Sequence, residues 1–207
     1  TLDTLEIISF QLINLPFLLD VIVKTIPIYY LVKSTVDGMR KNAPDYSKTI
    51  AVGLFLSSFG DIFLEFSVLQ SKPYFLCGLI AFLLAHLFYI GAFFKCDKTL
   101  GVGYALPFYA YALGLYAFLY PTTPEPLRIP VFAYAMIIAT MGWRSACLKA
   151  NGKMAVFGAV SFILSDSMIA INKFSTPFPG AKYAVMVTYY FAQWAIAKST
   201  QQIQSKK

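Results

Sequence analysis

The sequence lacks the polar coat that a water-soluble domain needs. Only 13% of its 207 residues are charged, against about 25% in ordinary soluble domains. Hydrophobic residues make up 58% of the chain and the mean hydropathy is +0.63. This composition excludes a soluble globule, a disordered chain and a secreted disulfide scaffold. It predicts an all-α fold, a polytopic membrane helix bundle in which residues 1–207 form a single integral membrane domain.

Residues that build common catalytic and metal sites are also scarce. His86 is the only histidine, so a three-histidine zinc site cannot be built. The three cysteines, Cys77, Cys96 and Cys147, form no CxxC pair and are odd in number, which argues against a disulfide frame and a cysteine metal site. No GxSxG, P-loop or GxGxxG motif occurs, so serine-hydrolase and nucleotide-binding functions have no support.

Seven long apolar runs are separated by short segments rich in proline, glycine and charge. Each run has about the 20 residues that a membrane-spanning helix needs. An earlier stretch, 5–15, is too short for a full span, and we expect it to be the remainder of an eighth helix that closes at Pro16. The seven predicted spans are roughly 18–36, 48–69, 74–94, 102–120, 127–147, 153–174 and 182–200.

The net charge of +7 would suggest a nucleic-acid partner in a soluble protein. Here the basic residues lie between apolar spans, where they set orientation, so no nucleic-acid partner is expected. Lys24 lies within a span. Of the other Lys and Arg residues, four fall on one side of the membrane, and the rest fall on the opposite side, which is therefore richer in positive charge. The richer side is cytoplasmic, so the C-terminus is predicted to face the cytosol. The poorer side holds Lys72, Arg128, Lys173 and Lys182; the richer side holds Lys33, Arg40, Lys41, Lys48, Lys95, Lys98, Arg144, Lys149, Lys153, Lys198, Lys206 and Lys207.

Five of the spans carry polar residues that lipid penalises. A charged side chain at a helix centre costs roughly 2.5–3.5 kcal/mol on insertion scales. A rise of about 1.5 Å per residue places these residues in one slab of the bilayer. We interpret the slab as one buried polar chamber, the alternative being interhelical hydrogen bonds that only hold the bundle together. The candidates are Lys24, Asp61, His86, Asp166 and Gln193, with Tyr89, Tyr190 and Asn172 as lesser ones.

A weak internal repeat relates the two halves of the chain. The segment 59–64 around Asp61 resembles 164–169 around Asp166, which lies 105 residues later. The related helices run in the same direction, which fits a parallel repeat about an axis along the membrane normal. Such an axis would bring Asp61 and Asp166 face to face.

Two carboxylates in a low-dielectric site can differ in ionisation, one protonated and one charged. Such a pair can protonate a substrate and then activate water, as in glycoside hydrolysis. His86 would orient one carboxylate or shuttle a proton between groups. A histidine that only packs or forms a structural hydrogen bond is the alternative.

Several motifs resemble the YhhN-like lysoplasmalogenase family, in the family's order. They are GLFLSSFGDIFL at 53–64, Ala85-His86 with Tyr89, MGWR at 141–144, FILSD at 162–166 with IAINKF at 169–174, and YYFAQ at 189–193. The resemblance runs from about Lys24 to Ser199 and is closest to the animal-type transmembrane alkenyl ether hydrolases. The family has eight spans.

The resemblance implies hydrolysis of the vinyl ether bond of 1-alkenyl lysophospholipids. The products are a fatty aldehyde and glycerophosphocholine or glycerophosphoethanolamine, and no metal or organic cofactor is required. The expected location is the endoplasmic reticulum membrane of a eukaryote. Asp61 and Asp166 would form the acid/base pair, with the two roles unassigned between them.

The remaining roles follow from the same resemblance and chemistry. His86 and Gln193 would orient the carboxylates or the attacking water. Lys24 would attract the headgroup phosphate or serve as the structural partner of an aspartate, and Asn172 would bond to the phosphate. Tyr89 and Tyr190 complete the predicted substrate-binding set. Aromatic residues that would line the chain pocket, unless they only pack, are Phe82, Phe162 and Tyr190.

Two other classes of function remain open at this point. A proton-coupled transporter or a lipid-binding membrane receptor could use the same buried Asp pair and would bind or move a ligand without cleaving it. A purely structural membrane subunit would tolerate neutral replacements at all of the polar positions.

Overall fold

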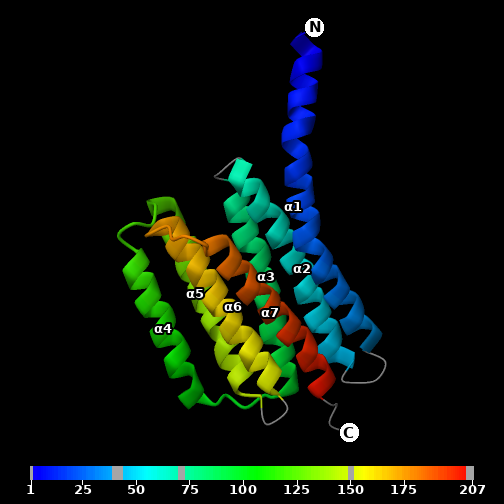
Figure 1. Ribbon diagram of the computed structural model, residues 1–207. Helices are drawn as coiled ribbons and strands as arrows, with labels where there is room; N and C mark the ends of the chain where they lie inside the picture. Colours follow the sequence, from blue (N-terminus) through cyan, green and yellow to red (C-terminus); the bar gives the residue numbers. More distant parts are fainter. Residues whose placement is uncertain (1, 39–43, 70–72, 149–151, 204–207) are drawn as a thin grey trace.

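The computed structural model describes residues 2–38, 44–69, 73–148 and 152–203. Within these ranges the fold is all-α, and successive helices run up and down the bundle (Figure 1). Helix α7 ends at the lower end of the bundle in Figure 1, and we call the opposite end the upper end. The helices are α1 (Leu2–Gly38), α2 (Pro44–Leu69), α3 (Pro73–Cys96), α4 (Ala105–Leu119), α5 (Glu125–Ala146), α6 (Lys153–Phe174) and α7 (Ala181–Gln202), with a 3-10 turn η1 (Val102–Tyr104) before α4.

The predicted class, a helical membrane bundle, is confirmed. Within the described residues, five segments are long and apolar enough to cross a membrane: Asp45–Ser67, Pro73–Cys96, Val102–Leu119, Glu125–Ala146 and Lys153–Phe174. Helix α7 and the described part of α1 do not reach this threshold. In α7 the cause is its content of polar residues, both buried and exposed, so the count of seven spans stays a prediction.

Helix α1 corrects the prediction for the N-terminus. We expected a helix break at Pro16, but α1 continues from Leu2 to Gly38. A proline removes only one backbone donor, and a helix in an apolar environment can continue past it when neighbouring turns keep their hydrogen bonds. Segment 5–15 is therefore the first part of α1 and extends beyond the other helices (Figure 1).

The helices pack as two hairpins with flanking partners. The most extensive contacts join α2 to α3 and α6 to α7. Helix α1 packs against α2 and α7, while α5 packs against α3, α4 and α6. If α1–α3 correspond to α5–α7, the α1–α7 and α3–α5 contacts correspond to each other, as the predicted parallel repeat requires. The repeat itself stays a prediction.

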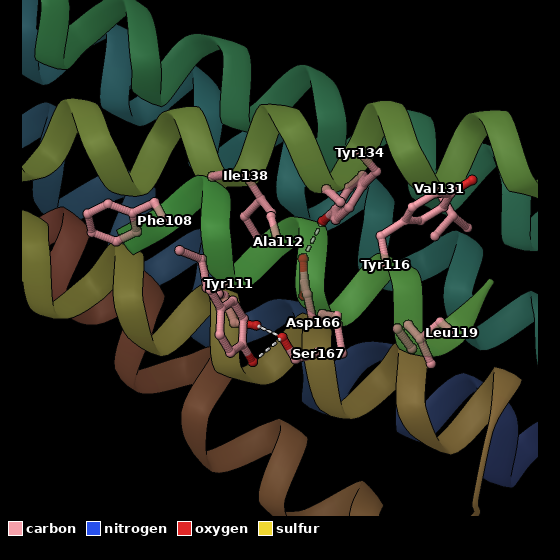
Figure 2. Close-up of a pocket in the computed structure, with 15 residues that line it drawn as sticks. Phe108, Tyr111, Ala112, Tyr116, Leu119, Val131, Tyr134, Ile138, Asp166 and Ser167 are labelled. Atoms are coloured by element: carbon pink, nitrogen blue, oxygen red, sulfur yellow. Dashed lines mark hydrogen bonds between the residues drawn. The ribbon is translucent and has the colours of Figure 1, made fainter. Parts of the chain in front are cut away.

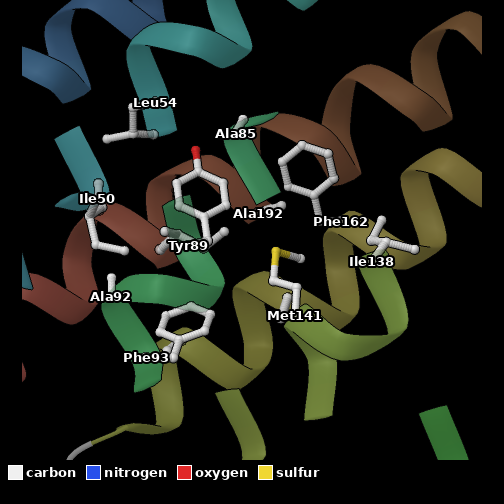
Figure 3. Packing of buried hydrophobic residues seen from close by; sticks show 14 of the residues in the cluster. Ile50, Leu54, Ala85, Tyr89, Ala92, Phe93, Ile138, Met141, Phe162 and Ala192 are labelled. Atoms are coloured by element: carbon white, nitrogen blue, oxygen red, sulfur yellow. The ribbon is translucent and has the colours of Figure 1, made fainter. Parts of the chain in front are cut away.

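Small residues allow the backbones of α6 and α7 to approach closely. A Cβ atom on Gly158 would lie 2.9 Å from the carbonyl oxygen of Ala192 and 3.0 Å from the backbone nitrogen of Ile196. This is the packing that membrane helices use, because lipid gives no hydrophobic drive for helix association. Larger buried side chains, among them Tyr89, Met141 and Phe162, fill the space between the hairpins (Figure 3).

At the lower end, Arg144 holds the loop that leads into α4. It is 2% exposed and donates hydrogen bonds to the carbonyl oxygens of Thr99, at 2.7 Å, and of Asp97. Trp143 donates to the carbonyl oxygen of Gly101 at 3.2 Å, and Gly101 has a left-handed φ of 40° that favours glycine. These contacts fix the start of α4.

Six of the basic residues used to predict orientation lie outside the described residues, namely Arg40, Lys41, Lys72, Lys149, Lys206 and Lys207.

Candidate active site

A cluster of polar side chains from three helices surrounds Asp166 on α6. Tyr134 of α5 donates a short hydrogen bond to Oδ2 of Asp166. Nε2 of His86 on α3 lies 2.9 Å from the Tyr134 hydroxyl oxygen and 3.7 Å from Oδ2 of Asp166. His86 is fully buried, whereas the Asp166 side chain is 15% exposed. The predicted association of His86 with an aspartate is therefore present, and we call these three residues the Asp166 cluster.

Hydrogen-bond directions assign the tautomer of His86. Because Tyr134 gives its proton to Asp166, its oxygen accepts the Nε2–H of His86. Nδ1 of His86 is buried and has no hydrogen-bond partner among the described residues. A proton on Nδ1 would be a buried, unpaired donor, which costs about 1–3 kcal/mol. The geometry thus makes Nε2 of His86 a donor to Tyr134, and the predicted role of His86 in orienting a carboxylate or shuttling a proton stays a prediction.

A second cluster surrounds Asp61 on α2. Tyr189 of α7 donates to Oδ2 of Asp61 at 2.6 Å and accepts from Nε2 of Gln193 at 3.0 Å. Oε1 of Gln193 accepts from the hydroxyl of Tyr89 at 2.8 Å, and Ser57 lies 3.3 Å from the same hydroxyl. The predicted residues Asp61, Gln193 and Tyr89 therefore belong to one continuous chain of hydrogen bonds, which we call the Asp61 cluster.

Aromatic rings lie between the two clusters, and the His86 and Tyr89 rings, one from each cluster, have their centroids 6.3 Å apart. The Phe162 ring lies 4.6 Å from the His86 ring and 5.4 Å from the Tyr189 ring, and Phe82 lies 5.9 Å from Tyr189. The structure thus places the predicted pair in neighbouring clusters, each carboxylate held by its own tyrosine. That both act on one substrate stays a prediction.

Two apolar cavities meet at Asp166. The α4 cavity has about 520 Å³ of empty space including its open mouth and lies between α4, α5 and α6 (Figure 2). The α3 cavity has about 470 Å³ of empty space, again including its open mouth, and lies between α2, α3, α5 and α6. Asp61 lines neither of these two. The residues that line both are Val131, Tyr134, Asp166 and Ala170.

The α4 cavity follows the length of α4. Its α4 wall runs from Phe108 to Leu119, a rise of about 16 Å. Asp166 and Ser167 face this wall from α6, and the Tyr111 hydroxyl donates to Ser167 at 3.0 Å (Figure 2). Apart from these polar groups the lining is aliphatic and aromatic, which suits a hydrocarbon chain that passes a carboxyl group.

Three predicted substrate-binding residues have protein partners. Lys24 forms an ion pair with Glu65 on α2, so its structural partner is a glutamate where we considered an aspartate. The Tyr190 hydroxyl donates to the backbone oxygen of Lys24 at 3.2 Å. Asn172 accepts from the backbone N–H of Phe178 at 3.3 Å and so closes the turn between α6 and α7.

Sequence analysis missed Tyr134 and Tyr189, the two donors to the carboxylates. Aromatic residues on apolar helices usually pack, but a buried tyrosine hydroxyl needs a partner, and that is the signal that could have found them. Tyr134 lies about 14 Å below the start of α5 and Asp166 about 12 Å below the end of α6, so their depths match. Among the residues that the structure describes, no group of three His, Cys, Asp or Glu side chains could hold a metal ion.

Fold and site together define a polytopic helical membrane protein with a buried, tyrosine-held carboxylate beside apolar cavities. The chain belongs to the YhhN family, whose model matches residues 19–200, so the family resemblance of its motifs is confirmed. No solved structure matches the chain.

Curated relatives carry one kind of name. The chain is 39% identical over 159 residues to the lysoplasmalogenase TMEM86A of Homo sapiens. The aligned region covers 72% of this chain and 64% of that relative. It is 37% identical over 157 residues to the lysoplasmalogenase TMEM86B of Sus scrofa, covering 76% and 65%. A lysoplasmalogenase homolog of Dictyostelium discoideum is 27% identical over 201 residues, covering 76% and 64%. The chain spans slightly less than two thirds of the length of these relatives.

Proposed function

We propose that the protein is a lysoplasmalogenase, a membrane hydrolase that cleaves the vinyl ether bond of 1-alkenyl lysophospholipids to a fatty aldehyde and a glycerophospho-headgroup. The names of its relatives support this substrate class. The observation that carries the proposal is the position of Asp166, a carboxyl group at the meeting point of two apolar cavities. A proton donor placed beside a bound hydrocarbon chain is what vinyl ether cleavage requires.

The proposed reaction consumes one water and changes no oxidation state. A carboxylic acid protonates the β-carbon of the vinyl ether, and the electrons of the double bond form the new C–H bond. The resulting oxocarbenium ion is attacked by water, which loses a proton to a carboxylate. The hemiacetal hydroxyl then loses its proton to the carboxylate while the glycerol oxygen gains one from the carboxylic acid, and the C–O bond breaks to release the aldehyde and the glycerol hydroxyl.

We assign Asp166 as the group that meets the substrate, because it lines both cavities. In its acid form it donates the proton, and as a carboxylate it accepts one from water. Tyr134 and His86 position it. Asp61, held by Tyr189, is the second carboxylate of the predicted pair and stabilises the cationic intermediate electrostatically. Gln193 and Tyr89 act through Tyr189 as positioning residues.

The proposed location is the endoplasmic reticulum membrane, with the C-terminus in the cytosol. Support for the orientation comes from the described cations that cluster at the lower end, where α7 ends. They include Lys95 at the end of α3, Arg144 at the end of α5 and Lys153 at the start of α6. An excess of Lys and Arg marks the cytoplasmic side of membrane proteins.

The test is aldehyde release by purified protein from 1-alkenyl lysophosphocholine, with the matched 1-acyl lipid as control. We expect release from the alkenyl lipid only, and a loss of about 10²- to 10⁴-fold in Asp166→Asn, the range for removing a general acid–base group. Asp20→Asn is the matched control, since Asp20 is half exposed and pairs with Lys182. Full activity of a folded Asp166→Asn protein contradicts the assignment, and lipid binding without cleavage favours a transporter or receptor.

A further inference from the structure

The described cations at the upper end differ in how their charges are balanced. Lys24 pairs with Glu65, and Lys182 pairs with Asp20 at 3.4 Å. Arg128 and Lys173 form no ion pair with any residue that the structure describes. An anion that reaches this end of the bundle therefore meets two cations that form no direct ion pair within the described part of the chain.

Lys173 lies directly above Asp166 on α6. The two residues are seven positions apart, so they share one face of the helix at a rise of about 10 Å. Ala170, between them on this face, lines both cavities, and Phe174 lines the α3 cavity. Nζ of Lys173 lies 4.2 Å from the ring centroid of Phe75, which lines the α3 cavity as well. The ammonium group is thus held at the rim of the space that leads to Asp166.

Arg128 lies above cavity-lining residues on α5, as Lys173 does on α6. It lies three and seven residues before Val131 and Ala135, which both line the α4 cavity, so it shares their face of the helix. Its guanidinium lies 4.5 Å from the ring centroid of Tyr120, and its Nε donates to the carbonyl oxygen of Thr123 at 3.3 Å. These contacts hold the cation at the upper rim of the α4 cavity.

Resting on the proposed function, we propose that Arg128 and Lys173 bind the phosphodiester of the lysophospholipid headgroup. Asp166 is about 12 Å from the upper end of α6 and about 20 Å from its lower end, so a polar headgroup reaches water by the shorter route at the upper rim. The glycerol unit, together with the reach of the Lys173 and Asp166 side chains, then covers the two helical turns between these residues. The alkenyl chain continues downward in the α4 cavity toward Phe108. This assignment replaces Lys24, whose charge is compensated by Glu65.

The experiment compares two substrates in maltoside micelles, where the substrate is the only source of phosphate. One is 1-alkenyl lysophosphocholine, and the other is 1-alkenylglycerol, which has the same vinyl ether and no phosphate. We expect Lys173→Gln and Arg128→Gln each to lower kcat/KM for the phosphate substrate by about tenfold, the lower end for contacts to a charged group, because both sites are partly open to water. Activity toward 1-alkenylglycerol should be unchanged. Lys182→Gln is the control of equal charge change, and Lys173→Arg should restore the preference.

The outcomes separate this site from the proposed function. Equal losses on both substrates, or an equal effect of Lys182→Gln, overturn the phosphate site. Wild-type protein that cleaves neither substrate overturns the proposed function instead. In that case binding of the uncleavable 1-alkyl lysophosphocholine to the same variants still decides the site, with about tenfold weaker binding expected in Lys173→Gln. If added anionic phospholipid changes wild-type activity, and Lys173→Gln removes this effect while keeping the substrate preference, the site binds bilayer lipid and the proposal is wrong.

Discussion

Replacing Tyr134 by phenylalanine removes one oxygen atom from the centre of the Asp166 cluster. The hydroxyl donates to Asp166 and accepts from His86 Nε2 at 2.9 Å, so two hydrogen bonds disappear together. A hydrogen bond to a charged group contributes about 1.5–3 kcal/mol. If that stabilisation acts mainly through the orientation of Asp166 in the transition state, kcat falls by about 10- to 150-fold. KM should change little, because Tyr134 bonds to the carboxylate and not to the substrate.

The assay is steady-state aldehyde release, with Tyr111→Phe as the matched control. Tyr111 lines the same α4 cavity, and its hydroxyl bonds to the neutral Ser167 at 3.0 Å. A neutral hydrogen bond contributes about 0.5–1.5 kcal/mol, so the control should lose clearly less activity. Thermal unfolding of both variants checks that packing is unchanged. A Tyr134→Phe enzyme with wild-type kcat, or one affected no more than Tyr111→Phe, would refute the role given to Tyr134.

Two further predictions concern stability and can be measured by thermal unfolding in detergent. Glu65→Leu should destabilise the fold by about 2–4 kcal/mol, because Glu65 is 6% exposed and its loss leaves the Lys24 charge unpaired. The double variant Lys24→Met with Glu65→Leu should recover most of this stability. A double variant as unstable as Glu65→Leu would contradict the pairing. Gly158→Ala should destabilise the fold by about 1–3 kcal/mol, because the new Cβ meets the backbone of α7. Gly114→Ala is the control and should stabilise the fold slightly, because nothing lies within 4 Å of a Cβ at that position. Equal effects of the two substitutions would rule out the close helix contact.

Composition and the spacing of apolar runs were sufficient to predict the helical class, because a chain so poor in charge has few other ways to bury its surface. Pro16 misled the prediction of the N-terminal helix, since a single missing N–H does not end a helix whose other backbone bonds are kept. Asp61, His86, Asp166 and Gln193 could be selected from the sequence because polar residues within membrane-spanning helices are costly and therefore rare.

The same argument could not supply the partners within each cluster. Depth gives a level along the membrane normal but not an angle around each helix, so it could not show that His86 belongs with Asp166 and Gln193 with Asp61. It also could not distinguish Tyr134 from the many tyrosines that only pack. Nor could depth show whether Lys24 pairs with Glu65 or with an aspartate, because that depends on side-chain geometry.

Because α4 lies at the edge of the bundle, the wall of the α4 cavity and the Asp166 cluster come mostly from different helices. One wall of the α4 cavity belongs to this peripheral helix, which packs chiefly against α5, while the Asp166 cluster comes from α3, α5 and α6 (Figure 1). Under the proposed function, substitutions along α4 are therefore expected to change the space for a hydrocarbon tail more than they change the groups proposed to transfer protons. Tail-length preference and reaction chemistry could then evolve independently.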